Sequence, residues 1–132
     1  MTWTTILFVL TLFRPAAAVP DISGSWAVMG NVTSGGGGAF GTFSATCTFQ
    51  QKDGKIDGVC KRTSGDVDAS GQVNEQGVSF QYDIDAGGAT LEFLFNGTLD
   101  KDATTITGGV TIENSGAGGA AEGTFTAKKQ KK

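Results

Sequence analysis

Apolar and polar residues alternate with a period of two along most of the chain after Asp21, and no window shows helical periodicity. Such alternation is typical of strands with one buried face. Turn-forming residues interrupt it at short intervals, so the pattern predicts eight strands. Their inward-facing positions fall within residues 22–28, 43–49, 56–60, 67–73, 78–84, 91–99, 106–112 and 123–127.

The clearest local signal is the hairpin centred on Asp53-Gly54. This pair favours a two-residue type I′ turn, in which both central residues have positive φ. The resulting register places Cys47 opposite Cys60, with Cα atoms about 4.5 Å apart, within reach of a disulfide. Both cysteines share the apolar face and no C-x-x-C spacing is present, which favours a structural disulfide inside the domain over a redox-active pair.

Short turns make neighbours in sequence antiparallel neighbours in space. We therefore expect an all-β fold, a single eight-stranded antiparallel up-and-down barrel with one hairpin disulfide. An open sandwich of two four-stranded sheets is the alternative. Nearly every strand has a glycine on its inward face, which permits sharp coiling and is expected to leave room near the axis. These glycines are Gly24, Gly41, Gly58, Gly71, Gly97, Gly108 and Gly123.

The first 18 residues are similar to a secretory signal peptide. An apolar run at 6–13 is too short to span a bilayer, and Ala16-Ala17-Ala18 fits a cleavage site. No Lys or Arg precedes the run, so an uncleaved apolar anchor is the alternative. The predicted organisation is a signal peptide (1–18), a barrel (19–127) and a basic tail (128–132). We expect a secreted protein, periplasmic if bacterial, with no membrane span after cleavage.

The chain of 132 residues contains no histidine, which removes the commonest general base and the commonest metal ligand. Its net charge is −3, its acidic residues are scattered, and no basic stripe precedes the tail. Nucleic acid is therefore not an expected partner, and we expect neither enzymatic activity nor a cofactor or metal. An isomerase or cyclase that only shapes a reactive ligand would need no histidine.

Three further motifs have plain structural interpretations. The pairs Asp66/Asp68 and Asp83/Asp85 fall on the outer phase of their strands, which predicts a solvated face rather than a catalytic or calcium site. The glycine run 35–38 opens no helix and predicts a rim loop. The sequons Asn31-Val32-Thr33 and Asn96-Gly97-Thr98 are glycosylation candidates in a eukaryotic secreted chain. Asn31 is expected at a strand end and Asn96 within a strand.

Aromatic residues concentrate on the inward phase. They would either fill the core or line an apolar cavity, and Tyr82 is the first candidate to orient a ligand because it also carries a hydroxyl. The candidate lining residues are Trp26, Phe43, Phe80, Tyr82, Phe93, Phe95 and Phe125.

Gly24-Ser25-Trp26 at the start of the first strand resembles the G-x-W signature of lipocalins and wider calycins, whose Trp closes one end of the barrel. The chain lacks the T-D-Y segment, the late Arg that covers this Trp, and the C-terminal helix. Avidins share the meander but build their biotin site from several Trp residues, whereas only Trp26 follows the leader.

A longer series of motifs is similar to those of small secreted barrels: G-x-W … F-x-x-K-D-G-K-I-x-G … V-x-F-x-Y … F-x-G-T-L … G-T-F-T-A-K-K. These are mostly bacterial and of largely unassigned role, so the resemblance implies a fold and a location. The leading functional hypothesis is a non-enzymatic binding module for a small apolar molecule in the barrel mouth. The alternative is an accessory module that contacts a protein through its outer face and glycine-rich loops.

Overall fold

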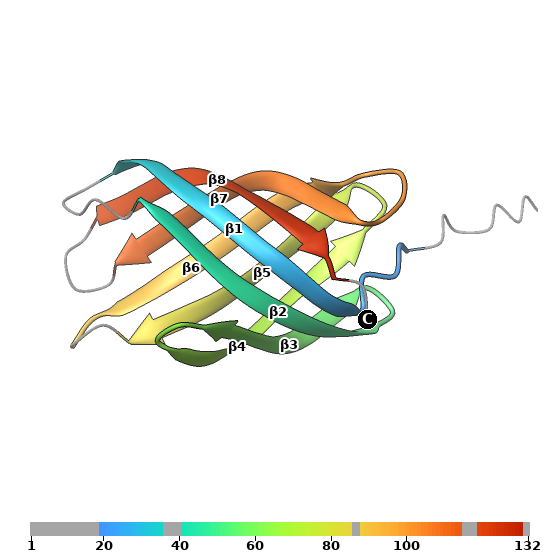
Figure 1. Ribbon diagram of the computed structural model, residues 1–132, viewed down its shortest axis with the longest axis horizontal. Coiled ribbons are helices and arrows are strands. Elements are labelled where there is room, and N and C mark those ends of the chain that lie inside the picture. The colour runs from blue at the N-terminus through green and yellow to red at the C-terminus, as the bar shows by residue number, and fades with distance from the viewer. Residues whose placement is uncertain (1–18, 36–40, 86–87, 115–118, 131–132) are drawn as a thin grey trace, which may run out of the picture.

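The computed structural model describes residues 19–35, 41–85, 88–114 and 119–130. These form eight antiparallel strands that close into one barrel, with β8 pairing back onto β1 (Figure 1). The barrel prediction is confirmed and the open sandwich is wrong. The strands are β1 (Gly24–Gly35), β2 (Thr42–Lys52), β3 (Lys55–Arg62), β4 (Gly65–Asn74), β5 (Gly77–Asp85), β6 (Thr90–Leu99), β7 (Thr105–Asn114) and β8 (Gly119–Lys129). The expected signal peptide and residues 36–38 of the glycine run lie outside the described residues.

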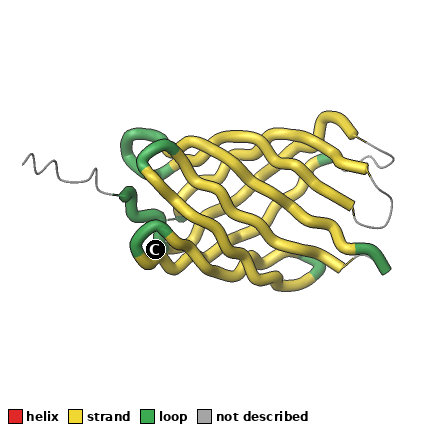
Figure 2. Tube along the Cα trace, turned by 180° about the vertical axis from the view of Figure 1, so that it is seen from behind, coloured by secondary structure: helices red, strands yellow, loops and turns green. Residues whose placement is uncertain are grey.

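The two ends of the barrel differ. Figure 2 shows strands joined by loops throughout the described chain. The β2–β3, β4–β5 and β6–β7 turns lie at one end, together with residues 19–23 and the last described residues; we call this the closed end (Figure 1). The strand termini on either side of the other four connections lie at the opposite end, which we call the open end.

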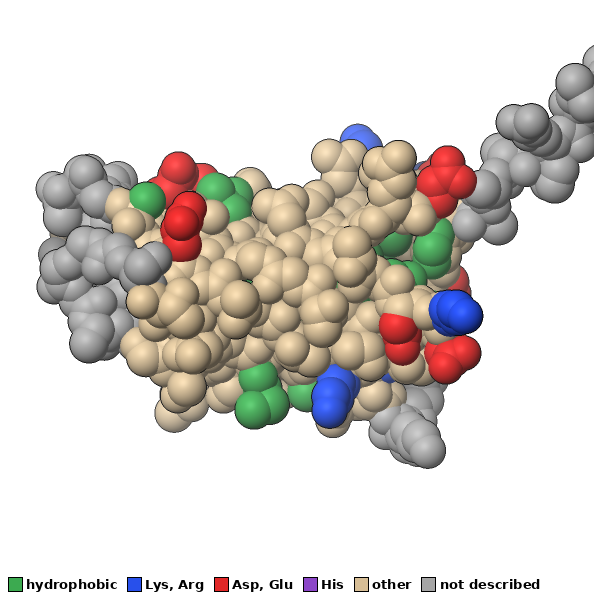
Figure 3. Space-filling view, turned by 90° about the horizontal axis from the view of Figure 1, so that it is seen from above, with side chains coloured by type: hydrophobic (Ala, Val, Ile, Leu, Met, Phe, Trp, Pro, Cys, Tyr) green, Lys and Arg blue, Asp and Glu red, His purple; other side chains and the backbone are tan. Residues whose placement is uncertain are grey.

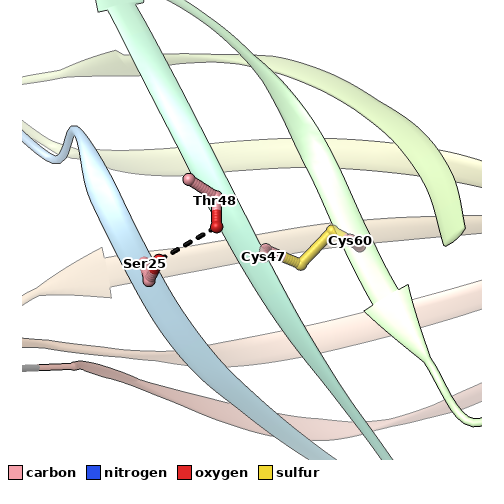
Figure 4. The surroundings of a disulfide bond; sticks show 4 residues. All are labelled: Ser25, Cys47, Thr48 and Cys60. Atoms are coloured by element: carbon pink, nitrogen blue, oxygen red, sulfur yellow. Dashed lines mark hydrogen bonds between the residues drawn. A yellow bond between two sulfur atoms is a disulfide. The ribbon is translucent and has the colours of Figure 1, made fainter.

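The predicted hairpin is confirmed in register and in covalent chemistry. Lys52 pairs with Lys55, and Cys47 pairs with Cys60 through a disulfide. Both cysteines are fully buried, so the bond lies inside the barrel as expected. Their Cα atoms are 3.9 Å apart, closer than expected. Figure 4 shows the alternation directly, because the neighbouring Thr48 points outward and shares a 2.9 Å hydrogen bond with Ser25.

The turn itself differs from the prediction. Asp53 has a φ of 57°, but Gly54 does not lie in the left-handed region, so the turn is not type I′. The carbonyl of Gly54 accepts a 2.8 Å hydrogen bond from the backbone N–H of Val73. The turn is thus tied to the end of β4, and this tertiary contact is invisible to a local turn rule.

Inward-phase glycines bring neighbouring strand backbones together. A Cβ on Gly108 would overlap the backbone carbonyl of Asn96, and Gly58, Gly71 and Gly123 meet a neighbouring carbonyl in the same way. Close approach of this kind at these four positions is compatible with the sharp coiling expected of glycine-containing strands.

Gly97 shows how the missing side-chain volume is used. A Cβ there would lie 2.8 Å from Cγ2 of Ile106 and 3.0 Å from Cζ of Phe125. At Gly30 the ring of Phe43 occupies the corresponding space. Larger side chains from other strands therefore fill the space left by these two glycines.

Phenylalanine rings fill the barrel axis. Phe80 and Phe95 stack with ring centroids 4.4 Å apart. Phe95 packs edge-on against Phe125 at 5.1 Å, and Phe49 against Phe80 at 5.2 Å. Contacts of this geometry add to the stabilisation from burying apolar area.

The closed end is sealed by the segment that precedes β1. Ile22 and Trp26 are fully buried, and the Trp26 indole N–H donates a 2.8 Å hydrogen bond to the Ile22 carbonyl. Gln51 accepts from the Ile22 N–H at 2.8 Å and donates to the Pro20 carbonyl at 2.9 Å. The ammonium of Lys129 lies 6.0 Å from the centroid of the Trp26 ring. A lysine thus covers the tryptophan in this chain, and β8 extends two residues past the predicted barrel boundary.

The shortest ladder in the barrel lies between β4 and β5. It has five residue pairs and stops at Ser70↔Gln81, although β3–β4 and β5–β6 pair as far as the open end. Continuing the same register would oppose Asp68 to Asp83 and Asp66 to Asp85. Like charges directly opposite one another destabilise a strand pair, which accounts for the early end of the ladder.

The glycine contacts predict a position-specific effect on stability. We expect G108A to lower the free energy of unfolding by about 1–3 kcal/mol, because the new methyl group would force two backbones apart. G109A is the matched control, since its Cβ would meet its nearest neighbour at an ordinary 3.6 Å. It should be neutral or stabilising by up to about 1 kcal/mol. Urea denaturation of both variants measures the difference, and equal effects would contradict the role given to Gly108.

Candidate functional site

Half-buried apolar side chains collect at the open end. Five residues there pack against the core yet remain partly exposed, whereas Leu99 is the comparable residue at the closed end. We call this set the open-end ring: Val32, Phe43, Val67, Ile84 and Leu91. Ile84 and Leu91 are directly paired across β5 and β6. Partly exposed apolar surface gathered at the mouth of a barrel is typical of a binding site.

The other predicted lining residues form the core. Their side chains are between 0% and 6% exposed, and they comprise Trp26, Phe80, Tyr82, Phe93, Phe95 and Phe125. Three hollows lined by described residues lie over the outer surface of the barrel, because most of their lining side chains are on the outward phase. Among the predicted lining residues, Phe43 alone is partly exposed, and it lies at the open end.

Tyr82 is less available to a ligand than the sequence suggested. Its ring stacks on Phe93 with centroids 5.0 Å apart, and its side chain is 3% exposed. Burial raises the pKa of Tyr82 to about 12, and the nearby positive charge of Arg62 opposes that rise. The hydroxyl therefore stays protonated in the physiological range, and Tyr82 serves mainly as a core residue.

A hollow of about 420 Å³ lies beside the open-end ring, between β2 and the β3–β4 turn. It exists because β2 pairs with β3 only as far as Thr46↔Lys61, while β2 continues back to Thr42. The end of β2 thus projects past the turn. We call this hollow the rim notch, and its lining residues are Met29, Thr42, Phe43, Ser44, Arg62, Thr63 and Ser64.

Arg62 is the functional candidate that the sequence reading missed. The alternation of β3 places it on the inward phase after Cys60, at the open end. Its Nη2 donates a 2.7 Å hydrogen bond to Oγ of Ser64, and the side chain is half-buried. A charged residue at the last inward position of a strand is the signal that could have identified it.

Carboxylates do not assemble into a site. The four aspartates of the predicted outer-face pairs are exposed, which agrees with the solvated interpretation. Within the described ranges, no three His, Cys, Asp or Glu side chains are placed to hold a metal ion. Figure 3 shows one face of the barrel on which neutral groups cover the middle and charged side chains lie toward the ends.

Three acidic residues lie side by side across β5, β6 and β7, and their like charges repel one another. Glu92 on β6 pairs directly with Asp83 on β5 and with Glu113 on β7. Partial burial raises the pKa of Glu92, the charges of Asp83 and Glu113 raise it further, and a hydrogen bond with Glu113 adds to the effect.

Both glycosylation candidates are exposed on strands. Asn31 lies within β1, not at its end as expected, and pairs with Thr42 and Thr124. Asn96 lies within β6 on the outer face, as predicted, beside an outer-surface hollow of about 560 Å³ across β3–β6.

The functional proposal rests on the geometry of the structure rather than on known relatives. No protein-family model matches the sequence, and no curated protein is significantly similar to it. The closed antiparallel barrel of eight strands is consistent with a calycin-like fold. Among the residues the structure describes, no helix is long and apolar enough to cross a membrane.

The acid row predicts a pH-dependent effect of Glu92. Because its pKa is raised by folding, the folded state binds the Glu92 proton more tightly than the unfolded chain, and ionised Glu92 lowers stability above that pKa. We expect E92Q to be more stable than wild type at pH 7, and the difference to disappear as the pH falls below the ordinary glutamate value of 4.5.

Urea denaturation at several pH values measures this difference. The control is E75Q, which removes the same charge from the exposed β4–β5 turn. Equal changes in the two variants at pH 7 would show that net charge, rather than the opposed carboxylates, is responsible.

Proposed function

We propose that this protein is a secreted, non-enzymatic binding module that accepts a small apolar molecule at the open end of its barrel. The observation that carries the proposal is the asymmetry of the two ends. Ile22 and Trp26 are fully buried at one end, whereas the open-end ring leaves apolar surface partly exposed at the other. The ligand would lie on this ring and in the rim notch, because aromatic rings occupy the interior below.

Two features support secretion. The first 18 residues are similar to a signal peptide, and the buried Cys47–Cys60 disulfide is typical of proteins from oxidising compartments.

The position of Lys129 over Trp26 supports kinship with calycins, since it matches the basic cover that the G-x-W motif implies. The absence of histidine from the sequence favours binding over acid–base catalysis.

The neutral fluorescent dye N-phenylnaphthylamine tests the proposal. We expect saturable binding with enhanced emission, and about tenfold weaker affinity in L91S, because the variant removes apolar contact area worth about 1.4 kcal/mol. L99S is the matched control. It lies on the same strand and the same face and is also partly buried, but at the closed end. It should bind the dye as tightly as wild type.

Fluorescence titration with both variants, after urea denaturation shows that each is folded, gives a clear outcome. The absence of saturable binding would overturn the proposal and favour protein contacts through the outer face. An equal loss of affinity in L91S and L99S would show that the dye does not bind at the open end.

A further inference from the structure

The rim notch is lined by one cationic side chain and by neutral ones, although the protein carries more acidic than basic residues. Arg62 provides a positive charge, and four hydroxyl side chains, Thr42, Ser44, Thr63 and Ser64, provide hydrogen-bond donors. No carboxylate is among its lining residues. Anionic oxygen atoms are therefore favoured at this position and cations are not.

The guanidinium of Arg62 retains most of its hydrogen-bonding capacity. It carries five N–H donors, and the structure records one hydrogen bond for it, to Ser64, with no ion pair to any described carboxylate. By contrast, Lys129, the inward-phase cation at the closed end, lies over Trp26. A planar guanidinium with free donors is the preferred protein partner of a carboxylate or sulfonate.

The apolar part of a ligand has a place next to this cation. The register that pairs Cys47 with Cys60 would, if continued, place Ala45 opposite Arg62 and Phe43 opposite Ser64. Phe43 also contacts Phe93 with ring centroids 5.7 Å apart, so its ring links the notch to the core. A head group held by Arg62 would leave an attached apolar body against Phe43.

The acids nearest in sequence lie on the opposite face of the sheet. Asp66 pairs with Lys61 on the outward phase, and both are exposed. Asp68 is likewise outward and exposed. Their charges are screened by water and salt, while Arg62 is half-buried beside the apolar ring.

We infer that Arg62 and the hydroxyl-lined rim notch select an amphipathic anion, with a carboxylate or sulfonate head in the notch and an apolar body against Phe43 and the open-end ring. This inference rests on the proposed function. It adds the chemical class of the ligand and assigns a specificity-determining residue.

Two dyes that share one ring system separate the inference from the proposed function. Anilinonaphthalene sulfonate carries an anionic head, and N-phenylnaphthylamine lacks it. We expect wild-type protein to bind the sulfonate about tenfold more tightly than the neutral dye, consistent with charge-assisted hydrogen bonds. R62Q should reduce the ratio of sulfonate to neutral-dye affinity to about one, and R62K should restore part of the preference.

The matched control is K61Q, which removes the same charge from the adjacent outward-facing position. It should leave both affinities unchanged. If neither dye binds wild type, the proposed function and this inference both fail. If the neutral dye binds but the sulfonate gains nothing, or if K61Q reduces sulfonate affinity as much as R62Q does, the inference alone is overturned. Urea denaturation of each variant excludes dye binding to loosely folded protein.

Discussion

The close approach of neighbouring strand backbones at inward-phase glycines is the constraint on which this barrel depends. At Gly108 and Gly123 a side chain would overlap the carbonyl of the next strand. This approach lets eight short strands coil tightly enough to close. At Gly30 and Gly97 the rings of Phe43 and Phe125 take up the space that a side chain would need, so a glycine-rich sequence still produces a filled core of phenylalanines. The buried Cys47–Cys60 disulfide fixes the register of two of these strands, since a one-residue slip would reverse every side chain.

Because side chains fill the interior of the barrel, we looked for a binding site at its two ends. Hydrogen bonds with the side chains of Gln51 and Trp26 hold residues 20–22 across the closed end. At the open end the strands have unequal lengths, because the first residues of β2 extend beyond the β3–β4 turn. That mismatch creates the rim notch and leaves Arg62 beside apolar side chains. The β4–β5 ladder stops short of this end, so the part of the barrel with the least backbone pairing is the part proposed to bind a ligand.

The fold was largely predictable from sequence because one periodicity governs almost every strand. Alternation assigned the inward face, and Asp53-Gly54 then fixed the pairing of Cys47 with Cys60. What the sequence could not provide depends on contacts between distant residues. The carbonyl of Gly54 accepts a hydrogen bond from Val73 of β4, and the cover on Trp26 comes from Lys129 near the other end of the chain. The candidate site was predicted only in part: Phe43 was identified, but the notch depends on where two strands end relative to each other, and strand ends are the least certain part of a sequence-based assignment.

The central claim is that the core is closed to ligands and that binding occurs at the open end. A backbone-amide NMR titration with N-phenylnaphthylamine tests it most directly. We predict that the largest chemical-shift changes occur at Phe43, Ile84 and Leu91, while the indole N–H of Trp26 and the amide of Phe49 stay unchanged. Large shifts at Trp26 and Phe49, with little change along the open-end ring, would contradict this account.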